Sequence, residues 1–224
     1  MNKYELLEDD TVEVNGRTFY RIRALRDFGD VRSGDKGGYI ESEKNLSQIG
    51  NCWVSDNARV FENARIFGNA RIFGNAMIYG NARVYDDARV FGDACVYGNS
   101  SVFLDACVYG NAMIYGTARV SRTSRVFGNA EVYENAQVSG NDQVYGNAKV
   151  AGNSWVFGNV RIFDDARVFD NSRVYENAQV FDSALVFGSA IVSGSSQVFG
   201  NARVSGNARV SGDSLISRNA EISS

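Results

Sequence analysis

The chain has 224 residues, and its 23 lysines and arginines against 26 aspartates and glutamates give a formal net charge of −3 at pH 7. That charge argues against a general nucleic-acid binder and is too weak for a carboxylate-coated mimic of DNA. Because the sequence has neither an apolar run long enough to span a membrane nor a signal peptide, we expect a cytoplasmic protein without a membrane partner.

The first 53 residues differ in pattern from the rest of the chain and predict a small β cap followed by a leader segment. Apolar residues alternate in Thr11–Val14 and in Arg17–Arg23, on either side of Asn15-Gly16, a dipeptide that favours a type I′ turn. We therefore expect a β-hairpin. At this end of the chain it would protect an unpaired strand edge of the β structure that follows.

From Val54 to Ile222 every sixth residue is Val or Ile, through 29 consecutive positions without an insertion. Six residues are too few for a helical hairpin and do not match the helical period, so each unit is predicted to be one short strand and one turn. Side chains alternate along a strand. The Val or Ile therefore points inward, while the Arg before it and the Phe or Tyr after it point outward.

Each unit also contains a predicted corner. Two residues after the aromatic comes Asn or Asp in most units, preceded by Gly or an acid, and these residue types tolerate the positive φ of a turn. The next residue is Ala or Ser almost throughout, from Ala58 to Ala220, since a small side chain suits the inside of a tight corner. Asp142 and Val160 are the clear departures.

This pattern, an aliphatic residue followed four places later by a small one, resembles the hexapeptide-repeat family over residues 54–224. The resemblance implies an all-β fold, a left-handed parallel β-helix of triangular section with three hexads per coil. The hexad arithmetic alone leaves a flattened, two-sided coil open. With three hexads per coil we expect about ten coils and, at about 4.8 Å between strands, a rod roughly 45 Å long. Residues 1–53 would form the separate N-terminal cap and leader.

The leader carries a second resemblance, to a group of bacterial and prophage hexapeptide proteins that are often labelled as uncharacterised transferases. The matching segments are Ala24–Val31, Gly37–Glu41, Asn45–Ser47 and Asn51–Val54. The resemblance implies a bacterial or prophage source, but the label itself carries little chemistry.

Catalysis is not expected. Acyltransferases that this family includes use a histidine as general base, the related γ-class carbonic anhydrases bind metal through histidines, and both build their sites with protruding loops. This chain has no histidine and no inserted residue in 29 hexads. A Cys or Glu could replace the base in principle, but the repeat assigns no partner to Cys95 or Cys107, which lie on different faces. With Cys52 at an inward corner, all three cysteines are expected to be free thiols.

Metal ions and cofactors are likewise not expected. An 18-residue coil stacks Asp164 on Asp182 with Asp165 beside them, and stacked carboxylates could share a hard cation. We interpret them as a solvated acidic corner, because no loop dense in oxygen ligands accompanies them. The repeated Gly-Asn-Ala corners are explained as turns and predict no phosphate loop.

The same stacking places Val160 and Ser124 on either side of Asp142. A buried carboxylate is costly unless it is hydrogen-bonded, so we expect either that Ser124 assists Asp142 or that this corner opens to water. Three positively charged residues lie nearby, Arg119, Arg122 and Arg125. In the same region two outward positions that are usually aromatic are serine, Ser121 and Ser139. We interpret this region as a solvated irregularity, with a functional patch as the alternative.

The outward aromatic residues form columns. One face stacks a predicted aromatic ladder of Phe73, Phe91, Tyr109, Phe127, Tyr145, Phe163, Phe181 and Phe199. Ring stacking along the sheet explains this ladder without a partner, with arginines such as Arg71, Arg89, Arg125 and Arg161 laid against it. The third face is interrupted at Ser121, Ser139 and Ser193.

A second face carries an uncharged block, Met77, Tyr79, Cys95, Tyr97, Met113 and Tyr115. Exposed apolar blocks of this kind often mark an interface, so we predict that it joins copies of the chain in a homo-oligomer, a dimer or trimer.

The sequence thus favours a non-enzymatic, rigid solenoid that acts by presenting surfaces to itself and, as a further option, to a host or phage protein. Three alternatives stay open: a phage inhibitor that blocks a host protein, an acyltransferase-like enzyme, and a scaffold that polymerises end to end.

Overall fold

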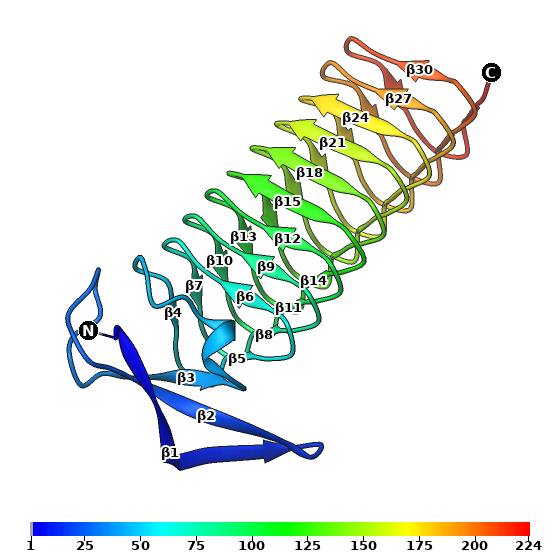
Figure 1. Cartoon of the computed structure of the whole chain (residues 1–224). Helices are drawn as coiled ribbons and strands as arrows, with labels where there is room; N and C mark the ends of the chain where they lie inside the picture. Colours follow the sequence, from blue (N-terminus) through cyan, green and yellow to red (C-terminus); the bar gives the residue numbers. More distant parts are fainter. Residues whose placement is uncertain (1) are drawn as a thin grey trace.

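The computed structural model describes residues 2–224, in which short strands wind into a rod of stacked three-sided coils (Figure 1). Met1, the first residue of the predicted cap, lies outside the described residues. Strands 18 residues apart pair in parallel, as Arg71 does with Arg89 and Ile72 with Val90. The predicted left-handed parallel β-helix with three hexads per coil is confirmed, and the two-sided alternative is wrong.

The strands belong to three sheets, which we call A, B and C. Sheet A contains β1 (Tyr4–Val14), β2 (Arg17–Ala24), β3 (Lys36–Ile40), β5 (Arg59–Val60), β8 (Met77–Ile78), β11 (Cys95–Val96), β14 (Met113–Ile114), β17 (Glu131–Val132), β20 (Lys149–Val150), β23 (Arg167–Val168), β26 (Leu185–Val186), β29 (Arg203–Val204) and β32 (Glu221–Ile222).

Sheet B contains β4 (Trp53–Val54), β7 (Arg71–Ile72), β10 (Arg89–Val90), β13 (Cys107–Val108), β16 (Arg125–Val126), β19 (Gln143–Val144), β22 (Arg161–Ile162), β25 (Gln179–Val180), β28 (Gln197–Val198) and β31 (Leu215–Ile216). Sheet C contains β6 (Arg65–Ile66), β9 (Arg83–Val84), β12 (Ser101–Val102), β15 (Arg119–Arg122), β18 (Gln137–Gly140), β21 (Trp155–Gly158), β24 (Arg173–Glu176), β27 (Ile191–Val192) and β30 (Arg209–Val210).

The core is a column of branched aliphatic side chains inside the coils. The inward Val and Ile residues from Val54 to Val210 are buried, and so are the small corner residues between them. Burying one such side chain contributes about 1.5–3 kcal/mol, and the column repeats that contribution three times per coil. The predicted inward and outward assignment of the hexad is therefore confirmed.

The corners depend on the residue directly after the aromatic. This residue has positive φ in most units, as at Gly74 with φ 70° and Glu62 with φ 55°. Where it is an acid and a glycine lies one coil later, the carboxylate accepts a hydrogen bond from that glycine, as Glu62 Oε2 does from the Gly80 nitrogen at 2.8 Å. The asparagine that follows links successive coils through its side chain. The Asn111 side chain, for example, donates a hydrogen bond to the Asn129 side chain one coil later at 3.0 Å.

The predicted hairpin is confirmed and is longer than expected. Strands β1 and β2 pair antiparallel around Asn15 (φ 51°) and Gly16 (φ 72°), but β1 begins already at Tyr4, and its register shifts between Leu7 and Thr11. β2 pairs with β3, which pairs in parallel with β5, so the hairpin continues sheet A beyond the first coil (Figure 1). β3 thus joins the solenoid sheets although it precedes the boundary predicted at residue 53.

The leader segment packs on the first coil of sheet B. The Phe28 and Trp53 rings meet edge to face at 5.4 Å between centroids, and the buried Lys3 ammonium donates to the Cys52 carbonyl at 2.9 Å. A single turn of 3-10 helix, Glu43–Asn45, lies between β3 and β4. Within residues 2–224, no helix has the length and apolar character needed to cross a membrane.

Candidate interaction surfaces

The uncharged block predicted from the sequence forms one continuous surface on sheet A, here called the Met–Tyr patch (Met77, Tyr79, Cys95, Tyr97, Met113 and Tyr115). Its strand positions are in register, because Met77 pairs with Cys95 and Cys95 with Met113. The three tyrosine rings stack at 4.9 and 5.0 Å, with interplanar angles of 1° and 5°. The patch is therefore flat over three coils.

Charged residues bound the patch along the rod axis. Arg59 precedes Met77 in the strand ladder, and Glu131 follows Met113. The Tyr115 hydroxyl donates to Glu131 Oε2 at 2.7 Å, and Lys149 pairs with the other oxygen at 2.7 Å. Although burial opposes it, hydrogen bonds from Lys149 and Tyr115 hold the pKa of Glu131 below its usual value. The patch thus ends at a fixed ion pair.

The patch itself stays uncharged at neutral pH. Burial raises the pKa of the Tyr79, Tyr97 and Tyr115 hydroxyls, and the hydrogen bond to Glu131 adds to the effect at Tyr115. Burial also raises the pKa of the Cys95 thiol. A thiol of this kind is a small apolar side chain and a weak nucleophile.

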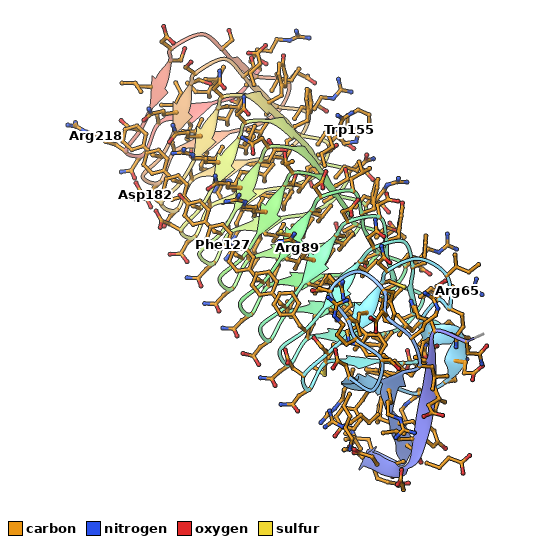
Figure 2. The ribbon with its side chains drawn as sticks, turned by 90° about the vertical axis from the view of Figure 1, so that its left-hand side faces the viewer. Arg65, Arg89, Phe127, Trp155, Asp182 and Arg218 are labelled. Carbon is orange, nitrogen blue, oxygen red and sulfur yellow. The ribbon has the colours of Figure 1, made fainter. Side chains whose placement is uncertain are left out.

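The aromatic ladder predicted on another face lies on sheet B. Its eight rings stack face to face from Phe73 to Phe199, at centroid distances of 4.6 to 5.0 Å and interplanar angles of 4° or less. Figure 2 shows Phe127 in this row of rings along the rod, with Arg89 nearby.

The arginines beside this ladder behave differently from the prediction. Among residues 2–224, the guanidinium groups that lie over rings do not include those of Arg71, Arg89, Arg125 or Arg161. Arg71 instead pairs with Asp30 of the leader. Ring stacking alone therefore accounts for the ladder, without a cation over each ring.

Sheet C departs from the regular pattern between β15 and β24. Ser121 and Ser139 leave two ring positions empty between Phe103 and Phe157, and the four strands here extend over four residues instead of two. Trp155 and Phe157 are 48% and 39% exposed, and they are the exposed aromatic side chains of the described chain. Figure 2 shows Trp155 projecting from the rod.

At the irregular corner beneath this region, the surroundings of Asp142 differ from both alternatives expected from the sequence. Ser124 does not assist the carboxylate, because its hydroxyl accepts from the Gly140 nitrogen at 3.0 Å instead. Nor does the corner open to water, since Asp142 is completely buried. Its Oδ1 accepts from the Val160 nitrogen at 3.0 Å, while Oδ2 has no hydrogen-bond partner. Burial raises the pKa of Asp142 to about 6, although the hydrogen bond from the Val160 backbone opposes this shift.

The remaining residues singled out from the sequence lie apart from these surfaces. Cys52 is buried, while Cys95 and Cys107 lie on sheets A and B, and all three thiols are free, as expected. At the acidic corner, Asp182 accepts from the Gly200 nitrogen at 2.9 Å and Asp165 from the Asn147 side chain at 3.0 Å. Residues 2–224 contain no group of three or more Cys, Asp or Glu side chains placed to hold a metal ion.

Sequence reasoning missed the exposure of Trp155 and Phe157. The signal was present, because Trp155 occupies a strand position that is Arg or Gln in the adjacent coils, and it follows two coils without an outward ring. The buried Lys3 ammonium beside Cys52 was missed as well, since nothing in a local pattern pairs residues that are 49 positions apart.

Comparisons with known proteins agree with the fold. A family model described as "YdcK Beta solenoid repeat" matches residues 64–80, 70–86, 76–90, 82–98, 196–212 and 202–218. A similar protein, described as "Uncharacterized acetyltransferase YdcK" of Escherichia coli (strain K12), is 50% identical over 36 residues. The aligned segment covers 16% of this chain and only 11% of that protein. The aligned segment is therefore a small part of either protein.

Proposed function

The chain is a hexapeptide-repeat β-helix protein, and we propose that it is a rigid, non-catalytic scaffold whose copies associate through the Met–Tyr patch. One observation carries the proposal: three successive coils of sheet A present stacked tyrosines beside Met77, Cys95 and Met113, and neither of these two columns contains a charged residue between Arg59 and Glu131. A flat apolar centre with a charged rim is the usual anatomy of an interface between subunits.

Two properties of the patch support self-association rather than a structural role alone. The rings are already fixed by stacking at 4.9 and 5.0 Å, so little side-chain freedom is lost when a second surface covers them. The methionines beside them can adjust to a partner surface at small cost. Because the patch is flat and regular, a second copy of the same patch is a complementary partner.

The experiment is the molar mass in solution, measured by light scattering for the wild type and for a Tyr97→Glu/Met113→Glu variant. We expect an oligomer for the wild type and a monomer of 24.5 kDa for the variant, because two buried carboxylates per subunit would face each other. The matched control is Phe127→Glu/Gln143→Glu, which changes a ring and the strand position one coil later on sheet B. The control should keep the wild-type mass.

A monomeric wild type, or a variant that keeps the wild-type mass, would contradict the proposal. Masses that grow without limit as the concentration rises would favour the end-to-end scaffold instead. We further propose that the protein has a bacterial or prophage source and a cytoplasmic location. A host or phage protein would then bind to faces of the rod other than the Met–Tyr patch.

Acetyl transfer is the second candidate, and it rests on the printed name of the similar E. coli protein. That protein shares only 36 aligned residues with this chain, and the chain contains no histidine to act as general base. Turnover of acetyl-CoA that disappears on substitution of one residue of this chain would favour the enzyme over the scaffold.

A further inference from the structure

A separate surface lies on sheet C, away from the Met–Tyr patch on sheet A. In regular coils of this sheet the outward rings stack, as Phe67 does on Tyr85 at 4.8 Å and Tyr85 on Phe103 at 5.0 Å. The column then loses its rings for two coils and resumes at Phe157, which stacks on Tyr175 at 5.0 Å. Phe157 therefore has one covered face, and the face toward Ser139 has no ring against it.

A hollow of about 470 Å³ lies where these rings are missing. Its walls are Trp155, Phe157, Gln137, Ser139 and Arg122, over the backbone of Gly140 and Gly158. Hollows of this size suit a small molecule rather than a broad protein contact. Only glycine fits at position 140, because a Cβ there would come within 2.5 Å of the Gly158 nitrogen and oxygen.

The charge around the hollow favours an anion. Arg122 lies on its rim with φ 60°, a conformation that is rare for a side chain of this size. None of the ion pairs formed by residues 2–224 involves Arg119, Arg122 or Arg125. The carboxylate of this corner, Asp142, is completely buried behind Gly140, with one oxygen unpaired. The Arg122 guanidinium is therefore the charged group among the side chains that line the hollow.

We propose that this hollow binds a small planar aromatic anion, whose ring stacks on Phe157 in the position left empty at Ser139. Trp155 packs against the side of the ring, Arg122 pairs with the anionic group, and the Gln137 side chain lies along the ring edge. The ligand thus replaces the ring that a regular coil would supply, and stacking on a fixed aromatic face provides most of the contact.

The chain contains its own reporter for this site. It has two tryptophans, and Trp53 is buried in the first coil while Trp155 is exposed at the hollow. The indole N–H signals in a ¹H–¹⁵N NMR spectrum of the full chain can therefore be followed during titration. We expect 2-naphthoate to shift the Trp155 signal saturably and to leave Trp53 unchanged.

Three further probes separate the contributions of ring and charge. Cyclohexanecarboxylate is anionic but not planar, and 2-naphthylmethylammonium is planar but cationic, so each should bind at least about tenfold more weakly than 2-naphthoate. AMP supplies the same chemistry through its purine and phosphate, and its affinity relative to 2-naphthoate tells whether nucleotides are a source of the ligand. If neither 2-naphthoate nor AMP shifts Trp155, or if cyclohexanecarboxylate binds equally well, the proposal is wrong.

Variants test the position of the ring. Ser139→Phe restores the missing ring and should reduce 2-naphthoate affinity at least about tenfold. Ser193→Phe, a matched change at another ring-free position of sheet C, should leave affinity unchanged. Arg122→Gln should abolish the preference for 2-naphthoate over the cationic probe and provides an independent test should Ser139→Phe fail to fold. Unchanged binding in both Ser139→Phe and Arg122→Gln would overturn the proposal.

Discussion

The coils of the Met–Tyr patch and the coils around β18 follow the same hexad, yet they differ in what surrounds it. In the patch every coil has a stacked ring and an alanine or serine inside the corner. Around β18 two rings are absent, Asp142 replaces the small residue, and Gly140 lacks the positive φ that the corresponding glycines adopt. The inward Val and Ile residues are buried in both regions.

This difference shows that the aliphatic column determines the fold and tolerates changes outside it. A regular coil has the expected residue at every position of the hexad, so its surface residues are needed only for ring stacking and solubility. The irregular coils violate several requirements together, which is typical of a site where stability has been exchanged for function.

The largest effect is expected when a regular corner is given the irregular residue. Ala112 follows Gly110-Asn111 as Asp142 follows Gly140-Asn141, so Ala112→Asp repeats the irregular sequence in the Met–Tyr patch region. We expect a loss of about 3–5 kcal/mol in the free energy of unfolding, because the carboxylate would be buried without the rearranged backbone. Urea denaturation at pH 7 measures it. An Ala112→Asp variant as stable as the wild type would remove the distinction between the two corners.

Removing the carboxylate charge from the irregular corner should have the opposite effect. The pKa of Asp142 is about 6 in the folded protein, above its usual value, so the fold favours the protonated form. The stability that this group contributes is fully present below about pH 4 and is lost as the pH rises through 6. The loss amounts to about 2–3 kcal/mol, because the pKa in the folded chain exceeds that in the unfolded chain by about two. Asp142→Asn keeps the oxygen that accepts from Val160 and should be more stable by about that amount at pH 8.

The pH dependence provides the control for this prediction. Wild type and Asp142→Asn should differ little in stability at pH 4 and diverge between pH 4 and pH 7. A difference that stays constant over this range would mean that the Asp142 carboxylate does not titrate there.

The smallest effect is expected in the ladder of sheet B. Phe163 stacks on two neighbours, at 5.0 and 4.9 Å, whereas Phe199 at the end of the ladder stacks on Phe181 alone. Phe163→Ala should therefore cost about 1–2 kcal/mol beyond the loss of buried area, and Phe199→Ala about half as much. Equal costs in thermal or urea unfolding would indicate that burial, rather than stacking, determines the contribution of these rings.

The sequence predicted the periodic part of the structure well, for a physical reason. Each inward Val, each small corner residue and each outward ring has the same neighbours in every coil, so the stacking of Phe73 on Phe91 follows from an 18-residue coil alone. The same arithmetic placed the Met–Tyr patch on one face. Its role in association remains a prediction.

Features that depend on a departure from the repeat could not be predicted in the same way. The sequence marked Asp142 as unusual, but the bond from Val160 and the missing help from Ser124 depend on how the corner backbone rearranges. The hollow beside Trp155 forms because rings are absent from two coils. Predicting it from the sequence would require knowing how the neighbouring side chains fill that space. Lys3 and Cys52 meet only through the folding of the leader.

Two native thiols test the self-association surface most directly. Cys95 lies within the Met–Tyr patch and Cys107 at the equivalent strand position on sheet B, and both are half-buried. Their rates of reaction with a thiol reagent, followed by mass spectrometry over a range of protein concentrations, compare the two faces within one molecule. We expect the rate at Cys95 to fall as the oligomer forms and the rate at Cys107 to stay constant. Protection of Cys107 alone, or rates at both thiols that do not depend on concentration, would contradict the account.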